Sequence, residues 1–265
     1  MINFLENMEE NLVILNYHDN FADNFSSYAY SKILEENSGI SCCYENKTSL
    51  RTAFEEKMSY FDMEYKFISS ARIEKLTKKA DNLNKYYINS KDIAKKKIKR
   101  GIINLKHFNL DDTKYLPKDL ISVFNFKNND FIVNYDILEE INSKNSIGLY
   151  ISKKDIDDNK IDFKFIKKAT KRLNKYLKKP KLFIFTNADL DFKIDSYIDY
   201  EIVNLRDWKE EFYFLKSCKH KIILNSQNSY SNGFWAALMS ELDYHYIVYD
   251  KNLNQKTKKL NWIAV

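Results

Sequence analysis

The chain has 265 residues, of which 44% are hydrophobic and 15% aromatic, so it can furnish the core of one large or two small domains and is not globally disordered. Its formal charge of +6 permits a nucleotide, an acidic glycan or an anionic membrane surface as a partner and selects none of them. Three cysteines, with Cys42 and Cys43 adjacent, favour a reduced, cytoplasmic setting over a disulfide framework.

Several sequence signals are missing. The N-terminus has no basic start followed by an apolar run, and no stretch approaches about eighteen uninterrupted apolar residues, so we expect neither a simple secretion signal nor a membrane span. The spacing of Cys218 and the four histidines resembles no zinc ligand set, so no metal site is expected. The chain also has no P-loop and no G-x-S-x-G nucleophile elbow.

The chain opens with a strand, a polar loop and a helix, which is how nucleotide-binding α/β units begin. Residues 11–17 have the pattern of the strand and residues 25–34 that of the helix, with Asp23 or Asn24 available as its cap. Further helices are expected over residues 73–100, ending at Gly101, and over 117–127 and 130–141.

From residue 146 onward, short apolar strands alternate with helical patterns. Five strands are expected, over residues 147–151, 181–186, 201–204, 220–224 and 246–249. Strands separated by helices pair in parallel through right-handed crossovers. We therefore expect a second α/β domain, with a boundary near residue 144 that divides the chain into residues 1–144 and 145–265.

The most informative segment is residues 211–238, which combines a helix, a buried strand and a polar turn. The strand leads into the sequence Asn225-Ser226-Gln227-Asn228-Ser229, and a helix is expected to start near Ser231. Ligands of open α/β sheets bind at the carboxyl ends of the strands, and the start of a helix offers unbonded N–H groups to an anion. This turn is therefore a candidate anion site.

The same segment resembles the C-terminal signature of the α-1,2-fucosyltransferases, glycosyltransferase family eleven. The signature reads CkHniiaNSsFSwWgAwL, and the matching positions here are Cys218, His220, Ile222, Ile223, Asn225, Ser226, Ser229 and Tyr230. Gln227 and Asn228 depart from it, and the glycine and tryptophan are displaced to Gly233 and Trp235.

A second similarity lies in residues 146–156, which resemble the HxRRGDY element that contacts the donor's pyrophosphate in this family. The corresponding residues are Tyr150, Ser152, Lys153, Lys154 and Asp155. Lysine in place of arginine keeps the positive charge but loses the bidentate fork. The alternative is an ordinary basic loop with surface lysines.

A third similarity lies in residues 182–193, which resemble the family's fyiFSDDieWvk, with Asn187 and Asp189 in place of its two acids. A polar side chain at a strand end can bond a base or a ribose hydroxyl, or simply cap a helix.

The loop after the first strand can be laid over the family's GGLGNQlFQYA opening. Asn24 stands in place of its glutamine, while its three glycines are replaced by Asp19, Asn20 and Ala22. The alternative is a capped helix after an ordinary polar loop.

The resemblance implies two Rossmann-like domains of the GT-B type, the N-terminal one smaller, helix-rich and facing the acceptor, the C-terminal one binding the nucleotide sugar. It implies inverting, metal-independent transfer of a sugar, most often fucose from GDP-fucose, to a hydroxyl of a surface glycan or its lipid-linked precursor, in bacterial polysaccharide biosynthesis. GDP-fucose is then a co-substrate and no cofactor is expected. Candidate bases are Asp23 and Asp155, and candidate acceptor contacts are His18 and Asn24.

Two other classes stay open. One is a catalytically inactive nucleotide-sugar-binding relative that acts as the partner of another protein. The other is a basic protein associated with membrane or nucleic acid, for which the lysine-rich residues 91–100 are the candidate surface, although a solvated helix face explains them as well. No RNA-recognition signature is present, so no nucleic acid is expected for the transferase, and its contact with a membrane would be peripheral, at the inner face.

Overall fold

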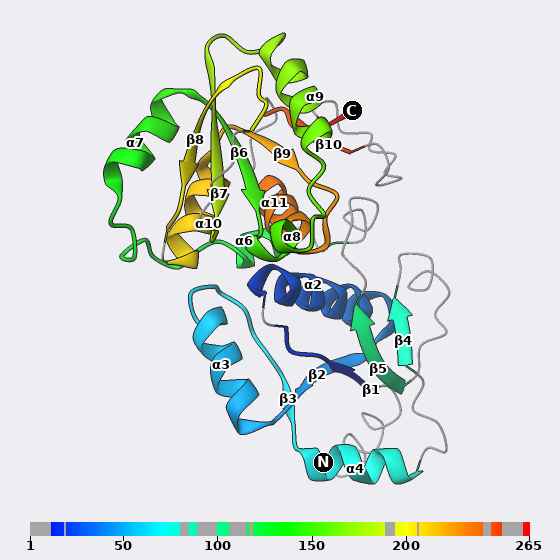
Figure 1. The fold of residues 1–265 in the computed structure, drawn as a ribbon. Helices are drawn as coiled ribbons and strands as arrows, with labels where there is room; N and C mark the ends of the chain where they lie inside the picture. Colours follow the sequence, from blue (N-terminus) through cyan, green and yellow to red (C-terminus); the bar gives the residue numbers. More distant parts are fainter. Residues whose placement is uncertain are drawn as a thin grey trace. The chain divides into compact units, whose positions relative to one another are not determined.

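The computed structural model describes residues 12–18, 20–79, 85–88, 100–105, 116, 119–188, 194–205, 207–240, 245–250 and 262–265 (Figure 1). The chain forms two compact units, unit 1 (Met1–Asn128) and unit 2 (Asn129–Val265), of which unit 1 is the shorter. Each unit contains a parallel sheet with helices. The predicted α/β fold class with two Rossmann-like domains is confirmed.

Unit 1 is built on a five-stranded sheet of order β3-β2-β1-β5-β4, in which each described pair is parallel. Its strands are β1 (Leu12–Leu15), β2 (Ser41–Glu45), β3 (Phe67–Ile68), β4 (Lys85–Ile88) and β5 (Arg100–Leu105). Its described helices are α2 (Phe21–Ser38), α3 (Thr48–Met58), α4 (Ser70–Lys79) and α6 (Leu120–Val123). Gly101, which we expected to end a helix, lies within β5 and pairs with Val13.

Helix α2 begins earlier than the sequence pattern predicts. Its N-cap is Asn20, whose side chain accepts a hydrogen bond from the Ala22 N–H, so the prediction of Asp23 or Asn24 as the cap is wrong. Asn24 is fully buried, where its Oδ1 accepts from the His18 N–H at 3.0 Å and its Nδ2 donates to the His18 carbonyl at 2.9 Å. These bonds fix the loop between β1 and α2. The helix ends at Gly39, whose φ of 63° is the left-handed conformation that glycine adopts without strain.

The core of unit 1 is largely aromatic. The centroid of the Phe25 ring lies 4.7 Å from that of Phe61 and 4.6 Å from that of Phe124. The ring centroids of Tyr44 and Phe54 lie 4.6 Å apart. Packing of this kind joins α2, β2 and α3 to the segment around α6.

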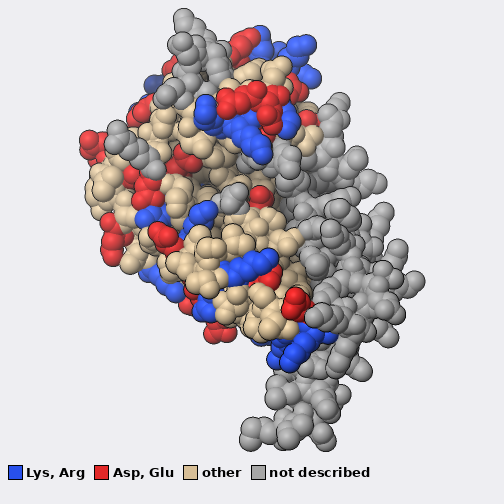
Figure 2. Space-filling view, turned by 60° about the horizontal axis from the view of Figure 1, so that its bottom comes forward, with Lys and Arg blue, Asp and Glu red and all other residues tan. Residues whose placement is uncertain are grey.

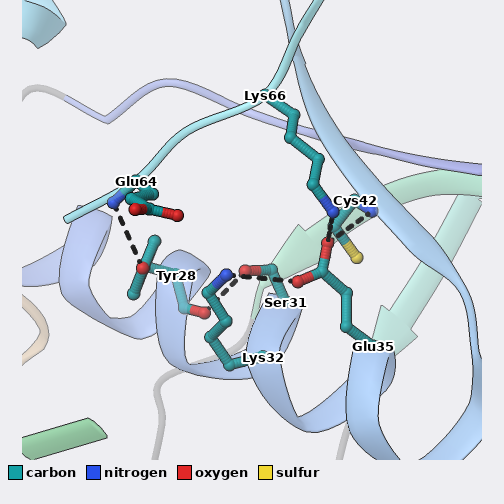
Figure 3. Close-up of polar contacts among 7 residues, drawn as sticks. All are labelled: Tyr28, Ser31, Lys32, Glu35, Cys42, Glu64 and Lys66. Atoms are coloured by element: carbon teal, nitrogen blue, oxygen red, sulfur yellow. Dashed lines mark hydrogen bonds and ion pairs between the residues drawn. The ribbon is translucent and has the colours of Figure 1, made fainter.

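A polar cluster at Glu35 ties α2 to β2 (Figure 3). The Glu35 carboxylate lies 2.7 Å from Lys66 Nζ and 3.2 Å from Lys32 Nζ, and it accepts the backbone N–H of Cys42 at 3.4 Å. Burial raises the pKa of Glu35, but the bonds and charges of the two lysines outweigh burial and leave that pKa below its usual value. Cys42 and Cys43 are both buried in β2, and burial raises the pKa of each thiol.

Unit 2 is built on a six-stranded parallel sheet of order β11-β10-β9-β6-β7-β8. Its strands are β6 (Asn145–Ile151), β7 (Pro180–Thr186), β8 (Asp199–Val203), β9 (His220–Ile223), β10 (Ile247–Tyr249) and β11 (Trp262–Ala264). Its described helices are α7 (Tyr135–Ser143), α8 (Lys153–Asp157), α9 (Phe163–Asn174), α10 (Trp208–Ser217) and α11 (Gln227–Leu238). Counted along the chain, this is the doubly wound Rossmann order, which reverses direction between β6 and β9.

The two faces of this sheet are covered by different helices (Figure 1). Ile147, Leu149 and Ile151 of β6 pack in one cluster with residues of α9. On the other face, Gly148 lets α10 approach closely, because a Cβ atom there would lie 2.9 Å from Leu215 Cδ1 and 3.1 Å from Cys218 Cβ.

The division between the units lies before α7, whereas we expected it near residue 144. Helix α7 packs against α10 and β6 of unit 2. The Glu210 carboxylate in α10 accepts the backbone N–H groups of Val133 and Asn134 at 2.8 and 2.7 Å. The residues that lead into α7 are therefore bonded to unit 2. Within the described residues, none of the helices combines the length and apolar character needed to span a bilayer.

Candidate functional site

The point at which the sheet of unit 2 reverses direction brings two predicted segments together. Strands β6 and β9 are parallel neighbours, with Ile147 opposite His220 and Leu149 opposite Ile222. The turns that follow them, at Ser152 and at 224–226, therefore leave the same edge of the sheet, and the helices that they begin, α8 and α11, are in contact. This is the position at which doubly wound sheets bind ligands.

Ser226 marks the start of α11 and is the most distinctive residue of this edge. It is the N-cap residue, yet its side chain makes no capping hydrogen bond. Its side chain is 6% exposed, and its Oγ has no hydrogen-bond partner among the described residues. A buried hydroxyl beside the first N–H groups of a twelve-residue helix is a ready anion site. Ser229 lies in the first turn of this helix.

A small cavity of about 230 Å³ adjoins the start of α11. It is lined by Lys160, Asp162, Phe165, Leu224, Asn225, Ser226 and Asp250. Asp250 directly follows β10 and is 8% exposed. Asp250 was not among the predicted site residues, although it follows the apolar strand Ile247–Tyr249. A carboxylate at such a strand end can accept hydrogen bonds from ribose hydroxyls. Asp162 also acts as the N-cap of α9, because its Oδ1 accepts from the Phe165 N–H at 3.0 Å.

The predicted donor-site residues after β6 and β7 are held together by one hydrogen bond. Asn187, after β7, accepts the backbone N–H of Lys153 at 2.9 Å and so fixes the start of α8. The side chains of Lys153 and Lys154 are exposed, and Lys153 Nζ lies 3.5 Å from Asp157 Oδ1. Asp189 lies outside the described residues.

A buried polar cluster lies behind this edge of the sheet, and it involves four elements. Burial and the charges of Glu211 and Asp155 raise the pKa of Tyr150, while a hydrogen bond to Asn232 opposes them. Asp155 is fully buried, so its carboxylate shapes the wall of the site rather than facing solvent. Burial alone raises the pKa of the Glu211 carboxyl to about 8, and its Oε2 has no hydrogen-bond partner among the described residues. Sequence reasoning did not identify Glu211 or Asn232, which reach this cluster only through tertiary packing.

The remaining predicted residues lie in unit 1. His18 lines a larger hollow there, of about 430 Å³, at the carboxyl ends of β1 and β2. The side-chain amide of Asn24 is hydrogen-bonded to the backbone of His18. Asp23 lies in the first turn of α2 and is partly exposed. Among the residues that the structure describes, no group of three or more His, Cys, Asp or Glu side chains could hold a metal ion.

Comparison with known proteins gives similarity of structure but not of sequence. Neither the protein-family models nor the curated proteins match the chain. Among solved structures, it is similar to a fucosyltransferase, NodZ from Bradyrhizobium (TM-score 0.43, 11% identity, covering 87% of this chain and 92% of that one). It is also similar to the E. coli heptosyltransferase WaaC crystallised with ADP-2-deoxy-2-fluoro heptose (TM-score 0.35, 8% identity, covering 96% and 92%). A third similarity is to CobK precorrin-6A reductase (TM-score 0.26, 8% identity, covering 91% and 88%). At these TM-scores the similarities carry no argument about function, which has to rest on the residues of the site.

Proposed function

We propose that unit 2 binds a nucleoside diphosphate sugar and that the protein is an inverting glycosyltransferase that resembles family eleven. The observation that carries the proposal is the start of α11, where a buried Ser226 hydroxyl without a hydrogen-bond partner lies beside the first N–H groups of the helix. The diphosphate of the donor lies there, between Ser226 and the exposed Lys153 and Lys154. The ribose of the donor occupies the adjoining cavity, with its hydroxyls bonded to Asp250.

These groups fit the chemical need of glycosyl transfer. As the glycosidic bond to the donor breaks, negative charge develops on the departing diphosphate, and fixed N–H groups and lysine ammonium groups stabilise it. The role requires no metal in this proposal. GDP-fucose is the donor that the family resemblance favours, and the acceptor is a hydroxyl of a surface glycan or of its lipid-linked precursor.

The acceptor hydroxyl must lose a proton to a base. Of the two candidates, Asp155 is fully buried and Asp23 is partly exposed in the first turn of α2. We therefore propose Asp23 as the base. Asp23→Asn is expected to reduce transfer by at least about a hundredfold without changing donor affinity, since general bases contribute roughly 10²- to 10⁴-fold.

Calorimetric titration with GDP, ADP, UDP and CDP tests the donor site. We expect one of the nucleoside diphosphates to bind, and GDP is the first choice. Lys153→Ala should weaken the affinity for it several-fold. Lys144→Ala, at an exposed lysine that precedes β6, should leave the affinity unchanged. The absence of binding by all four nucleotides would exclude the proposal. Release of GDP from GDP-fucose is measured in parallel, because it needs no knowledge of the acceptor.

The inactive-relative alternative is distinguished by the same experiments. The family's glycines are replaced in the loop after β1, and lysines stand where the family has arginines. If a nucleotide sugar binds with normal affinity and none of the sugar nucleotides tested is turned over, the protein is a binding relative.

Peripheral contact with an anionic membrane is a second candidate function, and helix α9 favours it. On the face of the molecule drawn in Figure 2, basic and acidic residues are interspersed. Helix α9, by contrast, contains no acidic residue, and Lys164, Lys168, Lys171 and Arg172 are exposed on it. The one ion pair that it makes with a described acid joins Lys167 to Asp195, at 2.5 Å. Phe163, Tyr176 and Tyr197 are exposed beside it, the last under the ammonium groups of Lys167 and Lys171.

Basic side chains with exposed aromatic rings suit the interface of an anionic lipid surface. Of residues 91–100, our sequence-based candidate for this contact, the structure describes only Arg100, which is the first residue of strand β5. The protein should cosediment with vesicles that contain about 30% phosphatidylglycerol. Replacement of Lys164, Lys168 and Lys171 by glutamine should abolish cosedimentation, since each lysine contributes about 1 kcal/mol to the free energy of membrane binding. Equal binding of wild type and variant would exclude this surface.

A further inference from the structure

The hollow in unit 1 has the size and position of a ligand site that is separate from the nucleotide site. Its volume of about 430 Å³ lies within the range of roughly 300–1,000 Å³ that small-molecule pockets have. It follows the carboxyl ends of the parallel strands β1 and β2 and is closed on one side by α3. Ligands of such sheets bind at this edge.

One wall of the hollow is aromatic and held in place. The Tyr17 hydroxyl donates a hydrogen bond to the backbone carbonyl of Glu45, and its ring lies 5.3 Å from both Tyr44 and Phe54. Burial is the main cause that raises the pKa of Tyr17 to about 12, so the hydroxyl stays protonated and keeps this bond at neutral pH. Leu50, an exposed apolar side chain of α3, continues the same lining. A fixed ring with apolar neighbours suits the C–H face of a sugar ring.

The rim of the hollow is polar and carries positive charge. The described lining residues include two lysines, Lys47 and Lys57, and one carboxylate, Glu45. The Glu45 carboxylate is 2.8 Å from Lys47 Nζ, and Lys57 is partly buried in the wall. Lys57 lies in the last turn of α3, at the other end of the helix from Lys47. The ammonium group of a lysine in the wall favours an anionic group on the ligand.

We propose that this hollow binds a pyranose that carries one anionic substituent, with its ring against Tyr17 and its anionic group at Lys57. Asn16 and His18 lie on the same lining and can bond ring hydroxyls. The inference rests on the proposed function in one respect, since it takes this sugar to be part of the acceptor. It defines the acceptor as an acidic glycan and Lys57 as the residue that selects it.

Ligand-observed NMR at millimolar sugar concentration tests the site directly, without any transfer reaction. The probes are methyl galactopyranoside, methyl galactopyranosiduronate and methyl galactopyranoside 6-phosphate, which share a ring and differ in charge. We expect the two anionic sugars to bind at least about tenfold more tightly than the neutral one, as a charge-assisted contact implies. The tighter of the two identifies the anionic group as a carboxylate or a phosphate. Equal affinity of all three sugars would overturn the inference.

Variants locate the binding. Lys57→Gln should reduce the affinity of the anionic sugars to that of the neutral sugar, while Lys127→Gln, at an exposed lysine that does not line the hollow, should not. Ala53→Phe places a ring in the hollow and should prevent binding, whereas Thr52→Phe, at the adjacent exposed position of α3, should retain it. Thermal unfolding checks that each variant is folded. If Lys57→Gln and Ala53→Phe are folded and bind as wild type does, the sugar lies elsewhere.

The same samples are titrated with GDP, ADP, UDP and CDP. Normal binding of a nucleotide without binding of either anionic sugar refutes only the inference about unit 1. Binding of the anionic sugars without binding of any of the four nucleotides refutes only the proposed nucleotide site.

Discussion

A single buried carboxyl, that of Glu211, lies behind the edge of the sheet at which β6 and β9 end, and it makes the stability of unit 2 depend on pH. The Glu211 carboxyl is 6% exposed, and burial raises its pKa to about 8 from a usual 4.5. A carboxyl whose pKa is raised on folding contributes stability below its unfolded pKa and loses that contribution as the pH rises towards its folded pKa. Glu211 is therefore a protonated, neutral group at pH 7.

We predict that the free energy of unfolding of the wild type falls relative to that of Glu211→Gln between pH 6.5 and pH 8, by about 1 kcal/mol for each pH unit, because the unfolded wild-type chain has released the Glu211 proton and the folded chain still holds it. The comparison with the variant is needed because the lowered pKa values of His220, His245 and Lys221 act on both proteins alike and in the opposite direction. Urea unfolding of both proteins across the interval measures the difference. A difference that stays constant over the interval, or that changes in favour of the wild type, would contradict the assignment.

Gly148 provides a second prediction at this scale. A Cβ atom at this position would lie 2.9 Å from Leu215 Cδ1 and 3.1 Å from Cys218 Cβ, so Gly148→Ala should destabilise the protein by about 1–3 kcal/mol. Gly233 in α11 is the matched control, because its nearest neighbours would be 3.8 Å from the added carbon. Gly233→Ala should stabilise the helix by roughly 0.5–1 kcal/mol. Thermal unfolding of the two variants should therefore shift in opposite directions.

At the scale of elements, the starts of α10 and α11 differ in a way that separates stability from binding. The N-cap Asp207 of α10 accepts a hydrogen bond from the Lys209 N–H at 2.9 Å, whereas the Ser226 hydroxyl at the start of α11 makes none. The first side chain stabilises its helix, and the second is available to a ligand.

We therefore expect Asp207→Ala to cost about 1 kcal/mol of stability and to leave nucleotide affinity unchanged. Ser226→Ala should do the reverse, with unfolding unaffected or shifted slightly upward and diphosphate affinity reduced about tenfold. Denaturant unfolding and calorimetry on the same preparations compare the two. Loss of stability in Ser226→Ala with unchanged affinity would show that the hydroxyl serves the fold.

The elements that sequence could predict are those whose pattern is local. Strands β6, β7, β9 and β10 are apolar runs bounded by polar residues, and each appears within a few residues of its expected place. Strand β11 was missed because it is an edge strand that forms by pairing with β10, a contact for which the local sequence carries no signal. Helix α11 starts at Gln227 rather than near Ser231, since tertiary context overrides the weak helix propensity of serine and asparagine.

The site was predictable in part for the same reason. The segments around Lys153 and Ser226 each follow a recognisable strand, and parallel pairing brings them to one edge. Asp250, Glu211 and the hollow beside Tyr17 depend on which strands and helices become neighbours. The sequence contains no local signal for those contacts.

At the scale of the whole molecule, the two units differ in the groups that titrate in acid. In unit 2, burial lowers the pKa of His220 to about 3 and that of His245 to about 4. Histidines with lowered pKa contribute stability above their unfolded pKa near 6.5 and lose it as the pH falls below that value. In unit 1, the pKa values of Glu35 and Glu45 are lowered, so their contribution is lost only as the pH falls below about 4.5.

The contribution of Glu211 in unit 2 grows as the pH falls, but the two histidines together outweigh it, so acid should unfold unit 2 before unit 1. All three tryptophans, Trp208, Trp235 and Trp262, lie in unit 2, so their fluorescence reports that unit alone. We expect the fluorescence transition to begin between pH 6 and pH 4. Part of the far-ultraviolet circular dichroism, that of unit 1, should be lost only at lower pH. Coincidence of the two signals at every pH would show that the units unfold together.

The three native thiols, Cys42, Cys43 and Cys218, are buried, and burial raises the pKa of each, that of Cys218 to about 12. Maleimide dyes react with exposed thiolates, so these side chains should remain unlabelled in the folded protein. One cysteine introduced on the surface of each unit, at Thr52 and at Lys144 for instance, could then carry a donor and an acceptor fluorophore in an otherwise wild-type background. Single-molecule energy transfer between them would follow the separation of the units as nucleotide and sugar are added.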